Sequence, residues 1–425
     1  MKIYKFGGAS LKNQNSLEDI YNIVKNEKNL ILVVSAIDKT TNALEMLVNA
    51  AFDNKQEKFQ LFEKIKNFHL NYVNNVFENL KNATTIISQK ESLKQLLEIR
   101  FNYLFDNINN CNTDDYDMFY DSIVPIGEFL SSTIVNAFLF AKGLNSCFID
   151  ITNCIRTDSC FRDAKILFED SEVAVQQEFS DRKKIYITQG FIGQEKGGFY
   201  TTLGREGSDY TAAALGYMLD AESVTVWKDV PGIMNADPAI FDFAKKIDKL
   251  SFKETIELAF YGAKVIHPKT IKPLENKNIP LYVKSFAEPE LEGSKIDNSE
   301  FPKGSLPPIF ILTTGQLLIS IQTKDFSFIV EENMSRILAE FAKYKIKINI
   351  MQNSAISFSL SINDNSYNID KLMEELKTDF VIKYNYNVNL LTIRNYNETV
   401  IENMLWDKKI LMEQRSRTTA RFIYE

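Results

Sequence analysis

The run Leu30–Val34 (LILVV) constrains the fold more than any other part of the sequence, because five apolar residues follow one another without interruption. Such a run predicts a strand that is buried on both faces, as in a parallel sheet covered by helices. Residues 3–6 (IYKF) and 223–227 (SVTVW) are also strand-like, and each runs into a turn of small or polar residues. Further strands are predicted at residues 147–151, 185–191 and 279–283. The pattern predicts an α/β fold, with an open, mainly parallel sheet sandwiched by helices.

Polar side chains follow these strands at their carboxyl ends, where open α/β sheets bind ligands. Lys5 lies just before a Gly7-Gly8 turn, whose backbone N–H groups can form an anion-binding concavity. Ser35 and Thr41 follow the next strand and are candidate hydroxyl donors. Each of these features also has a simpler interpretation, as an edge-strand lysine or as helix caps.

The segment 201–214 (TTLGREGSDYTAAA) predicts a tight turn between a strand and an alanine-rich helix. Gly204 and Gly207 allow positive φ and a close backbone approach to a ligand. Ser208 or Asp209 is expected to cap the helix. The N–H groups at the start of that helix would attract an anion.

Four charged residues extend this predicted anion site. Arg205 offers a planar fork suited to a carboxylate or phosphate. Asp209 is a carboxylate in a place suited to anions, so it should face a lysine, a metal or another cation. Glu128, in the first turn of a predicted helix, either binds a substrate ammonium group or simply complements the helix dipole. Lys228 begins a polar loop that suits the ribose or phosphates of a nucleotide.

Composition excludes several other classes of protein. The 425 residues carry a formal net charge of −7, which argues against a nucleic-acid binder. No apolar run has membrane-spanning length, and the start of the chain lacks a signal-peptide pattern, so we expect a cytoplasmic protein without a membrane partner. The four cysteines show no C-x-x-C pairing and predict neither a disulfide framework nor a zinc site. The two histidines, His69 and His267, are interpreted as structural.

The last third of the chain has a different pattern. Residues 292–308 are rich in Gly, Ser, Pro and charge and predict a linker. A βαββαβ order follows, which is the ferredoxin-like arrangement, and then a shorter β-α-β-β copy. The predicted domains are therefore residues 1–292, 309–386 and 387–425. The two small units suggest a small-molecule sensor or a dimerisation module, and their exposed sheet edges favour a homodimer.

Taken together, the motifs resemble those of the aspartate kinases of the amino-acid kinase family. Their order and spacing agree over nearly all of the first 285 residues, and the tail is similar to the family's ACT-type regulatory region. The segments that carry the resemblance are 5–8 (KFGG), 33–36 (VVSA), 41–42 (TN), 127–131 (GEFLS), 190–193 (GFIG), 201–211, 229–233 (DVPGI), 237–238 (DP) and 262–268 (GAKVIHP).

The resemblance implies transfer of a phosphoryl group from ATP, with Mg²⁺, to the side-chain carboxylate of L-aspartate. It implies that Lys5 contacts the transferred group and that Asp209 orders this lysine. The remaining implied ATP contacts are Gly7, Gly8, Lys228, Asp229, Met234, Lys264 and Val265. The implied aspartate contacts are Ser35, Thr41, Glu128, Arg205 and Ser208. No protein side chain is assigned as a metal ligand.

The chain departs from the family pattern at Ala9, Lys228, Glu206 and Ala239. Glu206 replaces a common glycine, and Ala239 stands where an arginine often follows Asp-Pro, and the resemblance implies that both positions lie close to the phosphate groups of ATP. Residues 347–354 lie where family members bind an inhibitory amino acid, and three alternatives stay open there: lysine, threonine or no effector. Two alternatives stay open: another acid kinase of this fold, such as one acting on glutamate, and a non-catalytic amino-acid-binding regulator.

Overall fold

The computed structural model describes the whole chain apart from residues 14, 79, 81–83, 112–113, 264–265, 303, 326 and 365–367. The chain forms two compact units. The first comprises Met1–Ile233, Lys246–Ala259 and Lys264–Glu300, and the second comprises Met234–Lys245, Phe260–Ala263 and Phe301–Glu425. The domain boundaries predicted at residues 292, 309 and 386 stay predictions.

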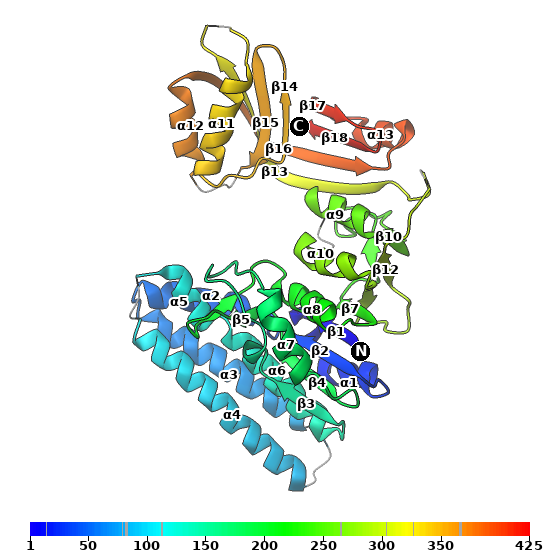
Figure 1. The fold of residues 1–425 in the computed structure, drawn as a ribbon. Coiled ribbons are helices and arrows are strands. Elements are labelled where there is room, and N and C mark those ends of the chain that lie inside the picture. The colour runs from blue at the N-terminus through cyan, green and yellow to red at the C-terminus, as the bar shows by residue number, and fades with distance from the viewer. Residues whose placement is uncertain are drawn as a thin grey trace. The chain divides into compact units, whose positions relative to one another are not determined.

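The first unit is built on an eight-stranded sheet with the order β10-β12-β11-β7-β1-β2-β4-β3 (Figure 1). Its strands are β1 (Lys2–Phe6), β2 (Leu30–Val34), β3 (Ser146–Ile149), β4 (Ile185–Gln189), β7 (Ser223–Lys228), β10 (Lys249–Ser251), β11 (Leu281–Ser285) and β12 (Ser294–Asp297). Two two-stranded sheets pair β5 (Ile192–Gln194) with β6 (Tyr200–Thr202) and β8 (Ile233–Met234) with β9 (Lys246–Ile247), and Met234 at the end of β8 is counted with the second unit.

Helices cover this sheet, and α3 and α4 run side by side (Figure 1). The helices of the first unit are α1 (Ser16–Val24), α2 (Thr40–Phe52), α3 (Glu57–Glu78), α4 (Thr84–Asn109), α5 (Tyr116–Ile123), α6 (Ile126–Ala141), α7 (Phe168–Glu178), α8 (Gly207–Met218), α9 (Phe252–Phe260) and α10 (Pro268–Lys277). Two 3₁₀ turns are η1 (Gly8–Leu11) and η2 (Ile151–Asn153).

Parallel pairing brings the carboxyl ends of the central strands to one edge. Lys5 on β1 lies opposite Val33 of β2 and Val226 of β7, and β2 in turn pairs with β4 in parallel. Every residue of β2 and β4 is buried, which explains the uninterrupted apolar sequence of β2. Only β12 runs antiparallel to its neighbour β11 in this sheet. The predicted α/β architecture is confirmed.

The second unit contains a six-stranded antiparallel sheet with the order β14-β15-β13-β16-β18-β17. Its elements are β13 (Ile309–Thr323), α11 (Glu331–Lys343), β14 (Ile350–Asn353), β15 (Ser357–Asn363), α12 (Ile369–Lys377), β16 (Phe380–Arg394), α13 (Glu398–Leu405), β17 (Ile410–Arg415) and β18 (Thr419–Tyr424). The predicted α+β fold class of this part of the chain is confirmed.

The two long strands of this sheet serve both ferredoxin-like units. The first residues of β13, Ile309 to Thr313, pair with Leu390–Arg394 of β16. The second ferredoxin-like unit therefore gains a strand from residues that precede most of the first ferredoxin-like unit. The two ferredoxin-like units thus interleave in sequence. Gly315, with φ of 61°, lies where the register shifts between the two halves of β13.

One helical stretch, Tyr116–Ala141, has the length and mean hydropathy of a membrane span. Of its most apolar 18-residue window, 78% is buried inside the protein. The helices α5 and α6 that form this stretch thus match the pattern of core helices as well as that of a span.

Candidate active site

A cavity of about 570 Å³ lies at the carboxyl ends of β1, β2 and β7 in the first unit. This is the edge where the sequence predicted a ligand site. The structure brings together eight of the predicted residues in its lining: Lys5, Ser35, Thr41, Glu128, Arg205, Ser208, Asp209 and Lys228.

Lys5 and Asp209 form an ion pair inside this cavity. Lys5 Nζ lies 2.7 Å from Asp209 Oδ1, and the two side chains are only 12% and 3% exposed. Asp209 sits in the first turn of α8, and Lys5 is next to last on β1. The pair therefore fixes the lysine amine in the cavity, and the Asp209 carboxylate lies at the positive end of the helix dipole, which suits a negative charge.

The turn before α8 differs from the prediction in two respects. The N-cap is Glu206, so Ser208 and Asp209 lie inside the first turn of the helix and do not cap it. Gly204 has φ of 73°, as expected, but the other left-handed residue is Glu206, with φ of 54°. Gly207 is required for close packing, because a Cβ there would lie 2.6 Å from Phe191 Cδ2.

The side chain of Glu206, whose backbone is left-handed, makes a hydrogen bond to a distant part of the chain. Its Oε2 accepts a hydrogen bond of 2.8 Å from the backbone N–H of His267. His267 in turn is the N-cap of α10, where its Nδ1 accepts from the backbone N–H of Lys269. The carboxylate that replaces the family's common glycine thus links the turn before α8 to the start of α10.

Glu128 presents a carboxylate without a full set of partners. Its side chain is 3% exposed, and Oε2 has no hydrogen-bond partner among the described residues. Burial raises the pKa of Glu128 to about 8, although the backbone N–H of Ala36 and the charge of Lys5 oppose the shift. A buried acceptor of this kind is suited to a cationic ligand group.

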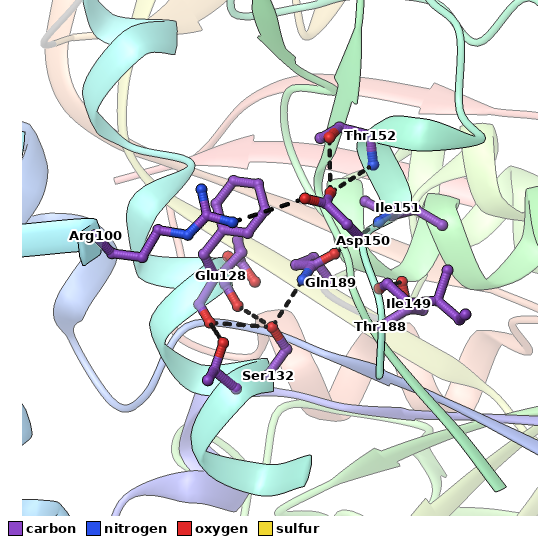
Figure 2. Close-up of polar contacts among 11 residues, drawn as sticks. Arg100, Glu128, Ser132, Ile149, Asp150, Ile151, Thr152, Thr188 and Gln189 are labelled. Atoms are coloured by element: carbon purple, nitrogen blue, oxygen red, sulfur yellow. Dashed lines mark hydrogen bonds and ion pairs between the residues drawn. The ribbon is translucent and has the colours of Figure 1, made fainter. Parts of the chain in front are cut away.

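Figure 2 shows how Ser132, one helical turn after Glu128 on α6, contacts the backbone of Glu128. The Ser132 hydroxyl donates to the backbone carbonyl of Glu128 at 2.7 Å and accepts from Gln189 Nε2 at 3.0 Å. Gln189 Oε1 accepts from the backbone N–H of Ile151 at 2.8 Å. The buried side chain of Gln189, at the end of β4, thereby links α6 to η2 by two hydrogen bonds.

Several predicted residues lie elsewhere. Within the described part of the chain, Gly7, Gly8, Asp229 and Met234 are not in the cavity lining, and Met234 groups with the second compact unit. Lys264 and Val265 lie outside the described residues. The roles implied for all of these residues stay predictions.

The two glycines after β1 contribute in different ways. A Cβ on Gly8 would lie 2.7 Å from the carbonyl oxygen of Ala36 and 2.9 Å from that of Asp38. A Cβ on Gly7 would meet only Lys5 Nζ, at 3.5 Å, and Gly7 has an extended backbone with φ of −76°. Glycine at position 8 thus allows the loop after β2 to pack directly against the turn after β1.

We therefore expect opposite stability effects at these neighbouring positions. Gly8→Ala should lower the free energy of unfolding by about 1–3 kcal/mol, because rigid backbone oxygens must move. Gly7→Ala should be neutral or stabilising by about 0.4–1 kcal/mol, because its backbone conformation suits alanine. Urea unfolding of both variants tests this, and equal losses would show that the close contact at Gly8 is unimportant.

Three residues of the cavity lining belong to no segment that the sequence analysis singled out: Glu45, Tyr120 and Arg162. Glu45 lies four residues after Thr41 on α2, so helical spacing alone places it on the same face. Tyr120 and Arg162 belong to no motif and come to the cavity only through the tertiary fold.

Comparison with known proteins agrees with this geometry. The sequence pattern of the amino acid kinase family matches residues 1–285, well over half of the chain. The chain belongs to this family.

Curated relatives of this amino acid kinase are aspartokinases. Lysine-sensitive aspartokinase 3 of Escherichia coli (strain K12) is 30% identical over 371 residues, which cover 85% of this chain and 78% of that protein. The aspartokinase of Chlamydia pneumoniae is 28% identical over 394 residues, covering 92% of this chain and 84% of that protein. The resemblance to aspartate kinases inferred from the motifs is confirmed.

A solved structure shares the fold of this amino acid kinase along its whole length. E. coli aspartokinase III, in complex with aspartate and ADP, matches with a TM-score of 0.80 at 24% identity, covering 100% of this chain and 96% of that one. The likeness in fold extends over the second compact unit as well as the first.

Proposed function

We propose that this chain is an aspartate kinase, which transfers the γ-phosphoryl group of ATP to the β-carboxylate of L-aspartate and forms 4-phospho-L-aspartate. This product is the entry to lysine, threonine and methionine synthesis. The observation that carries the proposal is the charge arrangement of one cavity: the buried, incompletely paired Glu128 shares it with Arg205 and with the Lys5–Asp209 pair. An α-amino acid with a second carboxylate complements that arrangement.

The residue types suit this chemistry. A carboxylate is already ionised at neutral pH, so the attack on phosphorus needs no general base. The obstacle is the repulsion between two anions, which fixed cations and amide N–H groups reduce when they are held in place before the reaction. We assign Glu128 to the substrate ammonium group, Arg205 to the α-carboxylate and Lys5 to the transferred phosphoryl group.

The remaining lining residues complete the assignment. Asp209 orients Lys5 through the ion pair described above. Ser35, Thr41 and Ser208 supply hydroxyl groups to the amino acid, and the first turn of α8 brings partial positive charge to the anions. Lys228 is assigned to the nucleotide, together with the residues that were implied by the family resemblance: Gly7, Gly8, Asp229, Met234, Lys264 and Val265.

The donor set fits Mg²⁺ that arrives with ATP. Among the described residues, no cluster of three or more His, Cys, Asp or Glu side chains forms a metal site. Mg²⁺ in kinases is commonly held by the substrate phosphates, water and one or two carboxylates. When bound, it would neutralise charge on the phosphates, and in this cavity Lys5, Lys228 and Arg205 add to that neutralisation.

The test is ADP release from ATP with a panel of acceptors, measured in a coupled assay. The proposal predicts turnover with L-aspartate and little or none with L-glutamate, N-acetyl-L-aspartate or UMP. Turnover restricted to L-glutamate would instead favour an acid kinase of different specificity. Failure of every acceptor, with aspartate still bound in calorimetry, would favour the non-catalytic regulator.

The raised pKa of Glu128 predicts how aspartate binding depends on pH. Only the ionised carboxylate pairs with the substrate ammonium group, and at neutral pH the free protein holds Glu128 mostly protonated. The dissociation constant for L-aspartate should therefore decrease by up to about tenfold per pH unit as pH rises from about 6 to 8, and then level off. Calorimetry can measure this, with Glu128→Gln as a pH-independent control. Wild-type affinity that is constant over the range would contradict the assignment.

We further propose that the second compact unit binds an amino-acid effector near residues 347–354. The name of the E. coli relative describes it as lysine-sensitive, and a solved structure of aspartokinase III contains lysine together with aspartate. Repeating the turnover assay with added lysine and with added threonine tests for an effector. Homodimerisation through this unit and a cytoplasmic location stay predictions, and light scattering at micromolar concentration tests the first.

A further inference from the structure

Arg162 lines the same cavity as Arg205 but comes from a different loop. Its backbone is left-handed, with φ of 67°, and its N–H donates to Asp121 Oδ2 at 2.9 Å. Asp121 is fully buried and also accepts from the backbone N–H and the hydroxyl of Thr202, at 2.9 and 2.7 Å. Three hydrogen bonds to one buried carboxylate thus fix the Arg162 loop to β6.

The guanidinium group of Arg162 lies near the rings of two tyrosines. Its Cζ lies 4.6 Å from the centre of the Tyr120 ring and 5.3 Å from that of Tyr116. Its Nη1 donates to Asp117 Oδ1 at 2.8 Å. A guanidinium carries five N–H donors in a planar fork, so a bond through Nη1 leaves capacity for a second anion.

The surroundings place Arg162 at the amino-acid end of the cavity. The Tyr120 hydroxyl donates to Glu45 Oε1 at 2.7 Å, and Glu45 lies one helical turn beyond Thr41. On the other side, a Cβ on Gly204 would be 3.3 Å from the carbonyl oxygen of Arg162. The loop of Arg162 therefore packs directly against the turn that carries Arg205.

We propose that Arg162 is a second substrate-binding arginine, which holds the α-carboxylate of the amino-acid acceptor together with Arg205. The inference rests on the proposed function and adds a residue to the same site. Asp117 occupies the fork in the absence of substrate. The side chains of this ion pair are 44% and 55% exposed, so the pair is weak, and a carboxylate placed between two arginines competes with it.

The test is steady-state kinetics of the full chain with Mg-ATP and varied L-aspartate. Arg162→Gly removes the guanidinium at a position where glycine adopts the backbone conformation without strain, and the N–H bond to Asp121 is kept. We expect the KM for L-aspartate to rise about 10- to 100-fold, with kcat and the KM for ATP changed less than about threefold. Arg162→Lys should recover only part of the affinity, because lysine lacks the planar fork.

Two controls separate binding from a structural effect. Arg182 is exposed and outside the cavity lining, so Arg182→Gly makes the same change in net charge and should leave both KM values unaltered. L-Aspartic acid α-amide, used as a competitor of L-aspartate, has no α-carboxylate. Its inhibition constant should be the same for the wild type and Arg162→Gly.

The possible outcomes are distinct. An active wild type whose KM for L-aspartate is unchanged by Arg162→Gly would overturn this inference and leave the proposed function intact. Equal weakening of L-aspartate and the α-amide would also overturn it, because the arginine would then act on something other than the α-carboxylate. A wild type without aspartate-dependent turnover would instead refute the proposed function itself.

Discussion

Replacing Lys5 by alanine is expected to lower kcat for aspartate-dependent ADP formation by about 10²- to 10³-fold, the usual effect of removing one preorganised charge-stabilising group. Lys5 is the cation that the Asp209 ion pair holds at the carboxyl end of the central strand, where the transferred phosphoryl group is proposed to lie. Saturating L-aspartate and Mg-ATP should not restore the rate. Steady-state kinetics of the variant measures this directly.

A control is needed because Lys5→Ala also leaves Asp209 buried without its partner. Breaking a buried pair in this way costs about 3–5 kcal/mol of stability, so inactivity alone could reflect unfolding. The double variant Lys5→Met with Asp209→Asn removes both charges and should regain most of the lost stability in urea unfolding. It should stay as inactive as the single variant. Recovery of turnover in the double variant would show that Lys5 only stabilises the fold.

The second large effect is expected at Glu128, where the carboxylate is proposed to bind the substrate ammonium group. Glu128→Ala should raise the KM for L-aspartate by at least about 30-fold, since removing one member of a buried charge pair costs about 2–5 kcal/mol or more. The KM for ATP should change little. Kinetics with each substrate varied in turn measures the two values separately.

Removing the charge of Glu128 should weaken the binding of L-aspartate but should not lower the stability of the protein. Burial raises the pKa of Glu128 from its ordinary value of 4.5 to about 8. Ionisation of Glu128 therefore lowers the stability of the substrate-free protein as the pH rises from the pKa of the unfolded chain to that of the folded protein. The isosteric variant Glu128→Gln should therefore match or exceed the wild type in thermal stability above that pH, while binding L-aspartate weakly. A variant that loses both stability and affinity would indicate a structural role for this carboxylate.

Much of the site could be predicted because its residues follow buried parallel strands. An apolar run such as Leu30–Val34 is visible in the sequence, and parallel pairing necessarily brings the next polar residues to one edge. Lys5, Ser35 and Lys228 lie in the cavity for this reason. Asp209 was expected to face a lysine, a metal or another cation, and it pairs with Lys5.

The remaining features depend on contacts that sequence patterns do not reveal. Arg162 reaches the cavity because Asp121, 41 residues earlier, holds its backbone N–H. The left-handed conformation of Glu206 is stabilised by His267, which is 61 residues away. In the second unit, the contribution of Ile309–Thr313 to a distant strand pair is set by the register of β13 against β16. In each case a long-range contact overrides the local preference of the chain.

The central claim is that this cavity lets the β-carboxylate of L-aspartate attack ATP. Hydroxylamine trapping tests it most directly, because an acyl phosphate reacts with hydroxylamine and a phosphate ester does not. The wild-type chain, incubated with Mg-ATP, L-aspartate and hydroxylamine, should form β-aspartyl hydroxamate in step with ADP, and Lys5→Ala should form almost none. ADP release without any hydroxamate, or hydroxamate formation that persists undiminished in Lys5→Ala, would contradict the account.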